Sequence, residues 1–329
     1  MRNEILDYFR KADGNFVSGQ QISKDLHVSR TAIWKHINVL KERGYIFESS
    51  TRKGYRLIYA PNLLTPLEID SALHTETFGR HVVYLESTQS TNEEAKKIAR
   101  EGAEEGTIVV AEEQITGHGR LARGFYSPFA EGIWFSLILR PKFFPMEASK
   151  CTLLAAVGVC RGIRRMGLAD AGIKWPNDIL VHGKKLVGIL TLMSASMEKI
   201  DYIIMGIGIN TGIKKNEFPE DFREGATSFL NEGINVSRKD LLAAILGELE
   251  KEYSIAQDEG FDKVLDDWRA LSVTLGQEVR VIFGDDSYTG KAVDIDRDGC
   301  LLVNTGSEVK RVIAGDVSIR PVDAPIPKR

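Results

Sequence analysis

Three short segments in the middle of the chain combine glycines with charged residues at close spacing. Residues 114–124 read Gln-Ile-Thr-Gly-His-Gly-Arg-Leu-Ala-Arg-Gly, residues 174–178 read Lys-Trp-Pro-Asn-Asp, and residues 185–189 read Lys-Leu-Val-Gly-Ile. Glycines let backbone N–H groups approach a ligand closely, and cations offset negative charge in a partly dry site. The three segments together predict a site that holds an anionic, reactive intermediate.

The glycine-rich segment carries its own cations. Arg120 and Arg123 lie between its glycines, and a strongly apolar run at residues 132–140 follows it. A loop that bears arginines and is anchored to a buried strand suits the capture of a phosphate or a carboxylate. The alternative is a flexible turn without a ligand.

The two lysine segments favour phosphate chemistry. Lys174 can pair with a phosphate, while Asn177 and Asp178 can hold Mg²⁺ through oxygen. A structural turn with Trp175 in the core is the alternative. Lys185 begins a predicted buried strand, where a lysine is costly unless it has an anionic partner.

Polar and glycine residues mark two further strand ends. Ser90, Thr91 and Asn92 occupy a predicted strand-to-helix junction, where their side chains could hydrogen-bond a neutral ligand. A helix N-cap with acids in the first turn explains the same residues, so both interpretations stay open. Residues 206–210, Gly-Ile-Gly-Ile-Asn, end another strand, and their glycines permit a ligand to approach closely.

Two common nucleotide-binding motifs do not match. The glycines at 206, 208 and 212 miss the dinucleotide-binding fingerprint, because the third comes one place late. Residues 284–291 imitate a P-loop, but the spacing is one residue too long, and Ala292 stands where Ser or Thr is required.

Length and composition set broad limits. A chain of 329 residues predicts two or three domains, and 43% hydrophobic with 27% charged residues is typical of a soluble globular protein. The N-terminus has no signal-peptide pattern, and no apolar run approaches the ~18 residues of a membrane helix. The three cysteines are few and widely spaced, and no Cys or His pair has zinc spacing. We therefore expect a cytoplasmic protein with no membrane partner and no structural metal.

Charge divides the chain unevenly. Residues 1–60 contain 11 Lys or Arg and 6 Asp or Glu, a net charge of +5, whereas the remainder carries −8. A basic head on an acidic body indicates a polyanion partner for the head alone. A solvated basic surface is the alternative.

The head begins with three predicted helices. Apolar spacing predicts the first over residues 3–11. Ser18, with Gln21 three residues later, predicts a capping box at the start of the second. Ser29 is the predicted N-cap of the third, and Gly44 ends it.

Two predicted strands, residues 45–48 and 55–58, complete a winged helix-turn-helix domain over residues 1–60. The exposed side of the third helix and the tip of the β-ribbon carry residue types that contact phosphates and base edges. The candidate DNA-binding residues are Ser29, Arg30, Thr31, Trp34, Lys35, Asn38, Arg52 and Lys53. A small helical protein-interaction domain is the alternative.

The rest of the chain predicts an α+β protein. Residues 67–270 mix strands and helices into a central α/β domain, in which residues 240–269 are expected to be helical with acidic faces. Short strands separated by Gly and Asp turns then predict a small antiparallel β-barrel over residues 271–329.

These motifs, in this order, resemble those of the bifunctional biotin protein ligase and biotin operon repressor family, and the resemblance spans the whole chain. The family's Ser-Thr-Asn lies at 90–92, its Gly-Arg-Gly-Arg-x-x-Arg loop at 117–123, and its Gly-Ile-Gly-Ile-Asn at 206–210. Its Lys-Trp-Pro-Asn-Asp and Lys-Leu-x-Gly-Ile motifs are the two lysine segments. One position departs from the pattern, because His118 stands where the family usually has arginine.

The resemblance implies the reaction. The biotin carboxylate attacks the α-phosphate of ATP–Mg²⁺, pyrophosphate leaves, and biotinyl-5′-adenylate stays bound. A lysine amine of a biotin carboxyl carrier domain then takes the biotinyl group. The protein needs no nucleophile of its own, so its contribution is positioning and electrostatics.

The resemblance also implies which residues act. Lys185 and Arg120 are the expected catalytic residues, which offset charge on the carboxylate and phosphoryl oxygens. The expected biotin-binding residues are Ser90, Thr91, Asn92, Gln114, Gly117, His118, Gly119, Arg120, Lys185 and Gly188. The residues expected on the ATP and magnesium side are Arg123, Lys174, Asn177, Asp178 and Asn210.

The resemblance implies a second role as well as an SH3-like C-terminal barrel. The adenylate would act as corepressor, and a homodimer would place two heads on a two-fold operator DNA. Two alternatives remain at this point. One is a repressor that senses biotin without ligase activity; the other is a lipoate or octanoate transferase, which the DNA-binding head and the motif at 174–178 disfavour.

Overall fold

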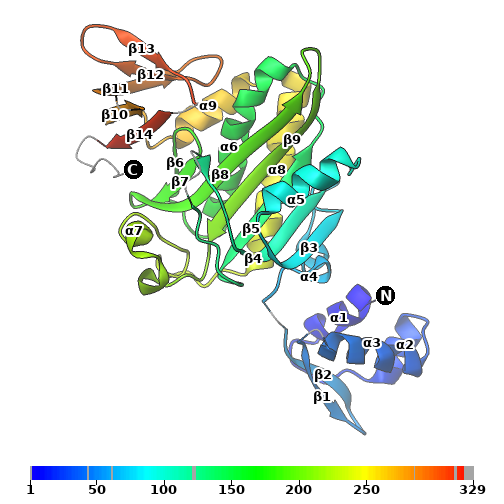
Figure 1. Ribbon diagram of the computed structural model, residues 1–329. Coiled ribbons are helices and arrows are strands. Elements are labelled where there is room, and N and C mark those ends of the chain that lie inside the picture. The colour runs from blue at the N-terminus through cyan, green and yellow to red at the C-terminus, as the bar shows by residue number, and fades with distance from the viewer. Residues whose placement is uncertain are drawn as a thin grey trace. The chain divides into compact units, whose positions relative to one another are not determined.

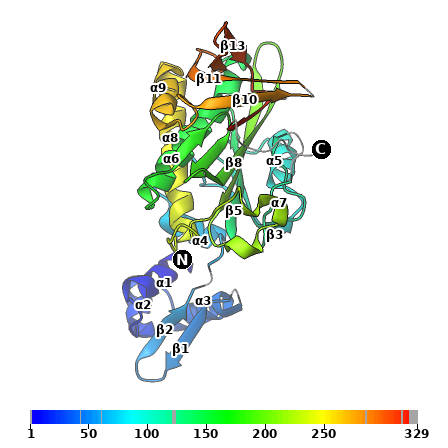
Figure 2. The same ribbon diagram turned by 90° about the vertical axis from the view of Figure 1, so that its left-hand side faces the viewer.

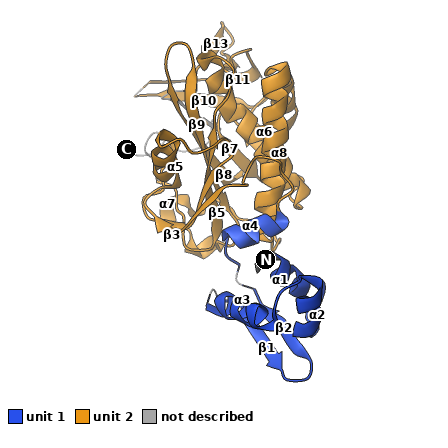
Figure 3. Ribbon diagram, turned by 90° about the vertical axis from the view of Figure 1, so that its right-hand side faces the viewer, with its two compact units in different colours: residues 1–72 blue, residues 73–329 orange. Residues whose placement is uncertain are grey.

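The computed structural model describes residues 2–42, 44–60, 62–120, 124–284, 286–314 and 317–321. The chain divides into two compact units, residues 1–72 and residues 73–329 (Figure 3). Arg123, expected to contact ATP, lies outside the described residues.

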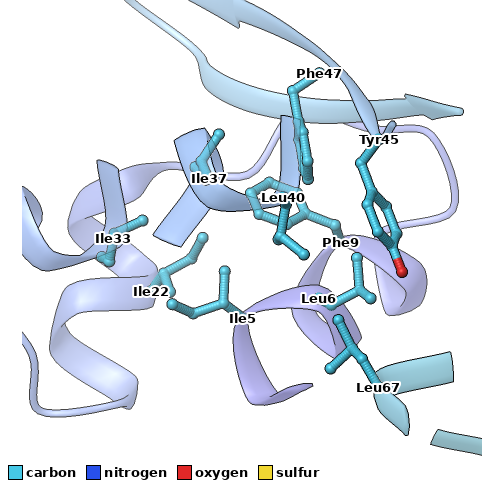
Figure 4. Close-up of a cluster of buried hydrophobic side chains, with 10 residues drawn as sticks. All are labelled: Ile5, Leu6, Phe9, Ile22, Ile33, Ile37, Leu40, Tyr45, Phe47 and Leu67. Carbon is cyan, nitrogen blue, oxygen red and sulfur yellow. The ribbon is translucent and has the colours of Figure 1, made fainter. Parts of the chain in front are cut away.

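The first unit has the predicted winged helix-turn-helix order. Its elements are α1 (Arg2–Lys11), α2 (Gly19–Asp25), α3 (Arg30–Glu42), β1 (Ile46–Ser50), β2 (Gly54–Tyr59) and α4 (Pro66–Ala72). The sequence did not predict α4. Figure 4 shows the core, where Ile5 and Phe9 of α1, Ile37 of α3 and Phe47 of β1 pack together. Leu67 of α4 belongs to the same cluster, so this helix is part of the unit.

The sequence predicted the helix cap of α3 correctly, but not the capping box of α2. Ser29 Oγ accepts a hydrogen bond from Ala32 N at 3.1 Å, which confirms the cap of α3. The capping box at α2 is wrong. Ser18 Oγ accepts from Gln20 N, and the Gln21 side chain donates to Asp25 rather than reaching back to the cap. A neighbouring carboxylate one turn on, which the pattern ignores, competes for the glutamine amide.

A seven-stranded sheet forms the centre of the second unit, in the order β3-β4-β5-β9-β8-β7-β6. The strands are β3 (Val82–Thr88), β4 (Ile108–Gln114), β5 (Gly132–Leu139), β6 (Gly172–Lys174), β7 (Asp178–Val181), β8 (Lys184–Ala195) and β9 (Ile200–Asn210). Among these described strands, β3 and β4 pair in parallel, and the other neighbours in the sheet pair antiparallel. Every residue of β5 is buried, as the apolar run predicted, because helices cover both faces.

The two faces of the sheet carry different helices (Figures 1 and 2). Helix α5 (Thr91–Arg100) covers one face, whereas α6 (Cys151–Arg165) and α8 (Arg238–Glu259) cover the other. The helical segment predicted over 240–269 is confirmed, and the structure divides it into two helices. The backbone at Gly260 has φ 84°, which ends α8, and the chain restarts as α9 (Asp262–Leu271). A glycine inside a helical pattern is such a stop when it takes this conformation.

A buried ion pair ties α8 to the sheet. Arg238 Nη1 lies 2.8 Å from Glu112 Oε2, and the two side chains are 1% and 0% exposed. Arg238 also donates from Nε and Nη2 to Gly132 O at 2.8 and 2.5 Å. The guanidinium thus joins β4, β5 and α8 in a place that water does not reach.

The C-terminal segment forms a five-stranded antiparallel sheet in the order β13-β12-β11-β10-β14. Its strands are β10 (Glu278–Phe283), β11 (Asp286–Ile295), β12 (Leu301–Asn304), β13 (Val309–Val312) and β14 (Val317–Pro321). Trp175, 1% exposed, connects this sheet to the central one. Its Nε1 donates to Gly299 O at 3.0 Å, and its backbone N donates to Thr274 Oγ1 at 2.9 Å.

The described residues of the second unit also include several short helical turns. They are η2 (Pro145–Lys150), η3 (Lys215–Glu217) and α7 (Glu220–Arg223). Within the ranges that the structure describes, every helix falls short of the length and apolar character that crossing a membrane requires.

We predict that Arg238→Met destabilises the second unit by about 3–5 kcal/mol, because it leaves the Glu112 carboxylate buried without its cation. Urea unfolding followed by tryptophan fluorescence measures this, since Trp134, Trp175 and Trp268 lie in that unit. Arg165→Met is the matched control. It removes an arginine that pairs with Glu248 but is 66% exposed, so the expected loss is about 1 kcal/mol or less. Equal losses in the two variants would contradict the prediction.

Candidate functional site

A patch without large side chains lies on the α5 face of the central sheet. Ser136 of β5 pairs with Gly206 of β9, and Gly208 of β9 pairs with Gly188 of β8. A Cβ at Gly206 would lie 2.2 Å from Asn92 Oδ1, so this glycine is what lets the start of α5 contact the sheet. We call these four residues the glycine floor.

The predicted neutral polar residues meet at one edge of this floor. Ser136 Oγ lies 2.6 Å from Asn92 Oδ1 and 2.8 Å from Thr91 Oγ1. Gln114 Oε1 accepts from Thr91 N at 2.9 Å and from Thr91 Oγ1 at 3.1 Å. Gln114 in turn donates to Ser127 Oγ at 3.1 Å. The network fixes the orientation of these groups before any ligand arrives.

The Ser90 side chain distinguishes between helix capping and ligand binding as its role. It occupies the N-cap position of α5, but its side chain makes no capping hydrogen bond. Helix capping therefore does not explain this hydroxyl, which is half-buried beside Thr91.

The glycine-rich segment folds back on itself over the described part of its length. Gln114 pairs with Ser127, and His118 bridges to Gly124. Phe125 N donates to Gly117 O at 2.7 Å, and a Cβ at Gly117 would lie 2.6 Å from Phe125 O. The sequence predicted that Gly117 allows a ligand to approach closely. In the structure, the atom that a side chain at Gly117 would meet first is the main-chain oxygen of Phe125, on the returning side of the loop. The His118 side chain is exposed, and Gly119 is half-buried.

Phe125 covers the glycine floor. A Cβ at Gly208 would lie 2.5 Å from its ring, and one at Gly188 would lie 2.9 Å away. The ring packs edge-on against Trp134 with 5.8 Å between centroids, and Lys185 Nζ lies 5.6 Å above its centre. An ammonium over an aromatic face is attracted by the ring quadrupole.

Lys185 has the anionic partner that its buried strand required. Its Nζ lies 2.7 Å from Asp178 Oδ1, and the two side chains are 35% and 20% exposed. Lys174 pairs with Asp178 across β6 and β7, so the two lysine motifs meet at this hairpin. Partial exposure leaves Lys185 able to exchange Asp178 for an anion that enters the site.

Arg120, the second cation expected in the site, is held by Asn177, the residue next to Asp178. Arg120 Nη1 donates to Asn177 Oδ1 at 3.3 Å, and its Nη2 donates to Ala314 O, just after β13, at 3.2 Å. Asn177 is itself fixed, because its Nδ2 donates to Ile189 O at 2.7 Å. Adjacent residues thus position Lys185 and Arg120 beside the glycine floor.

Asn210 is turned toward the protein. Its Nδ2 donates to Thr227 O at 2.9 Å, and it is 5% exposed. Residues 225–227 run beside the start of β8, where Ala226 bridges in parallel to Lys185.

The site offers few oxygens for a cation. Among the described residues, no group of three or more His, Cys, Asp or Glu side chains could hold a metal ion. The Asn177 oxygen already accepts from Arg120, which leaves Asp178 as one carboxylate ligand. Mg²⁺ commonly binds proteins through one or two carboxylates and takes its other ligands from substrate phosphates and water. The residues present fit an ion that enters with a nucleotide.

Sequence reasoning missed several members of the site. Ser136 was detectable as the one hydroxyl within the apolar run of β5, since a polar residue in a fully buried strand needs a partner. Phe125, Ser127 and Thr227 gave no comparable signal. Their roles depend on how the loops return to the sheet.

Most of the residues expected to bind DNA are exposed in the first unit. Ser29, Arg30, Thr31 and Lys35 are exposed, and Trp34 is 52% exposed. Asn38 is half-buried, whereas Arg52 and Lys53 are exposed in the turn between β1 and β2. Lys53 Nζ and the Arg56 guanidinium lie 5.6 and 4.9 Å from the Phe16 ring centre, which supports this ribbon.

Models of known families match three parts of the chain. Residues 84–210 match the biotin/lipoate A/B protein ligase family, residues 2–56 match an HTH domain, and residues 274–320 match the biotin protein ligase C terminal domain.

Curated relatives match almost the full length. The bifunctional ligase/repressor BirA of Bacillus subtilis is 39% identical over 97% of this chain and 98% of its own. The protein of that name from Escherichia coli is 30% identical over 95% of each chain. A solved biotin protein ligase from Aquifex aeolicus, in complex with biotin and ATP, superposes with a TM-score of 0.64 and 28% identity, over 74% of this chain and 99% of that one.

We predict that Gly208→Ala displaces Phe125 and loosens residues 114–127, because the added Cβ would lie within 2.5 Å of the ring. Overpacking of this kind costs about 1–3 kcal/mol. Amide hydrogen exchange in that segment should accelerate by about tenfold or more. Gly247→Ala, where nothing lies within 4 Å, is the control. Unchanged exchange in Gly208→Ala would show that Phe125 does not hold the segment.

Proposed function

We propose, since this chain belongs to the bifunctional ligase/repressor family, that it is an ATP-dependent biotin protein ligase that also represses transcription. The observation that carries the ligase role is the hairpin at Asn177 and Asp178, which holds Arg120 and Lys185 on one side of the glycine floor. Two cations at fixed positions suit a reaction in which charge develops on carboxylate and phosphoryl oxygens.

The first step joins biotin to the nucleotide. A biotin carboxylate oxygen bonds to the α-phosphorus of ATP, the bond to the bridging oxygen breaks, and pyrophosphate leaves. Lys185 and Arg120 offset the negative charge of the two reacting groups, which would otherwise repel each other. Asp178 keeps the Lys185 ammonium directed into the site until substrate replaces it.

The polar network at the start of α5 binds the neutral ring of biotin. Ser90, Thr91, Asn92 and Gln114 supply donors and acceptors at the edge of the glycine floor. The main chain of Gly117, His118 and Gly119 lies beside them and suits the carboxylate, and Gly188 lets the Phe125 ring and the Lys185 side chain approach the sheet closely. Groups already fixed by one another lose little entropy when the ligand binds.

The nucleotide lies toward the lysine motifs. We assign Lys174 and Arg123 to the phosphates on the strength of the family motifs, and Asn210 anchors the segment at Thr227. Mg²⁺, when bound with ATP, reduces the charge of the triphosphate. Asp178 is the residue of this chain that would hold it.

The second step transfers the biotinyl group. A lysine amine of a biotin carboxyl carrier domain attacks the acyl carbon of biotinyl-5′-adenylate, the acyl–phosphate bond breaks, and AMP leaves. The protein orients the two reactants and forms no covalent bond itself.

The head, residues 1–60, carries the proposed DNA-binding activity. The face formed by residues 29–38 of α3, with the turn at Arg52 and Lys53, suits a major groove and its phosphates. We propose operator DNA of the biotin synthesis genes as its partner and a homodimer that forms with biotinyl-5′-adenylate bound. Two identical heads would then meet a two-fold site.

A repressor that only senses biotin is the alternative, and one measurement decides between them. Biotin-dependent exchange of radioactive pyrophosphate into ATP requires adenylate formation. Exchange at a rate well above that without biotin supports the ligase. If biotin causes no exchange, the result supports the repressor that only senses biotin.

We predict that Lys185→Ala lowers the rate of biotin adenylation by about 10²-fold or more, as expected for one charge-stabilising group. The same exchange assay measures this. Lys184→Ala is the matched control, because successive strand residues point to opposite faces, and it should retain the wild-type rate. A normal rate in Lys185→Ala would exclude the proposed role of this residue.

We predict that Lys35→Ala weakens binding to a duplex DNA that the wild type binds, and lowers the slope of log affinity against log salt by about 1, the value for one lost phosphate contact. Lys11→Ala removes the same charge from the end of α1, outside α3, and should leave the slope unchanged. Fluorescence anisotropy across a salt series gives both slopes. Equal slopes for the two variants would remove α3 from the DNA interface.

A further inference from the structure

A chain of hydrogen bonds leads from the β7–β8 turn to the segment beside Lys185. His182 and Gly183 form this two-residue turn, with φ 48° and 77°, the conformation that tight hairpins favour. His182 Nδ1 lies 2.8 Å from Glu232 Oε2. The other oxygen of Glu232 accepts from Thr227 Oγ1 at 2.5 Å. One carboxylate thus holds a turn and a loop that are far apart in sequence.

Thr227 is in turn bonded through its main chain to two site residues. Its N donates to Lys185 O at 2.9 Å, and its O accepts from Asn210 Nδ2 at 2.9 Å. Lys185 N donates to Gly225 O at 2.8 Å, so the segment borders both polar groups of the lysine main chain. Thr227 is 2% exposed. A shift of this residue would move the backbone from which the catalytic lysine extends.

Glu232 is held as a carboxylate at this point. Its side chain is 13% exposed. Burial alone would raise its pKa, but the hydrogen bonds from Thr227 and His182 outweigh burial, so the pKa of Glu232 lies below its ordinary value. Charged acceptors make the stronger hydrogen bonds, which suits a group that must fix its neighbours.

We propose that Glu232 is a positioning residue for the adenylation step: by holding Thr227 it fixes the main chain of Lys185 and the amide of Asn210. This proposal rests on the proposed ligase function. It concerns a residue that contacts neither substrate in that scheme and acts through Thr227.

The test measures biotin-dependent ATP–pyrophosphate exchange with the full chain carrying Glu232→Ala, Glu232→Gln or Thr227→Val. We expect Glu232→Ala and Thr227→Val each to lower kcat by about tenfold, consistent with one lost hydrogen bond to a charged group, with KM for biotin unchanged. Glu232→Gln keeps an acceptor for the Thr227 hydroxyl and should restore kcat to within about twofold of wild type. The double variant should be no slower than either single one, because both remove the same bond.

Glu224→Ala is the control, since Glu224 is 81% exposed and pairs with Lys215 in the same part of the chain. It should keep the wild-type kcat. All rates are taken per biotin-binding site counted by titration, so a variant that is only partly folded does not pass as a slow one. If Glu232→Ala does not fold, the near-isosteric Thr227→Val decides alone.

Two results would overturn the proposal: a normal kcat per site in Thr227→Val, or losses in the two single variants that add in the double one. Either would leave the ligase function intact, provided that wild type exchanges and Lys185→Ala does not. Absence of exchange in the wild type would instead remove the proposed function on which this inference depends.

Discussion

The arrangement of the site depends on backbone that carries no side chain. At Gly206 a single methyl group would occupy the space of the Asn92 amide, and at Gly208 it would enter the Phe125 ring. The start of α5 and the return of the glycine-rich loop can therefore both rest directly on the sheet. The Asn92 amide rests on this surface directly, and Gln114 is held beside it by hydrogen bonds with Thr91 and Ser127.

The positions of the two cations in the site depend on hydrogen bonds and an ion pair rather than on glycines. Lys185 and Arg120 come from separate segments, but both are held by one turn of chain, at Asp178 and Asn177. Cations of this kind are useful only if their positions do not relax when the reacting charges change. A turn that is anchored to the core by the buried Trp175 side chain meets this requirement better than a free loop would.

The sequence predicted those parts of the protein that depend on local pattern. The run at β5, the cap of α3 and the need of Lys185 for an anionic partner followed from hydrophobicity, capping chemistry and the cost of burial. The capping box failed because of a local competitor that the pattern does not count, the Asp25 carboxylate that binds the Gln21 amide. The division of the helical segment at Gly260 depends on a backbone conformation, φ 84°, that the helical pattern does not reveal. Phe125 on the glycine floor and the Glu232–Thr227 contact were beyond prediction, because they join residues whose separation in space is set only by the completed fold.

The link between Arg120 and Ala314 bears on how this chain can be divided. The C-terminal sheet provides, just after β13, the acceptor for one nitrogen of the guanidinium, and its loop at Gly299 receives the indole N–H of Trp175. These strands are thus not a detachable module: a chain shortened before residue 272 would remove the Ala314 acceptor from Arg120 and the Gly299 acceptor from the Trp175 indole. The chain divides into separate compact units instead between residues 72 and 73, so a truncation there leaves both of these hydrogen bonds in place.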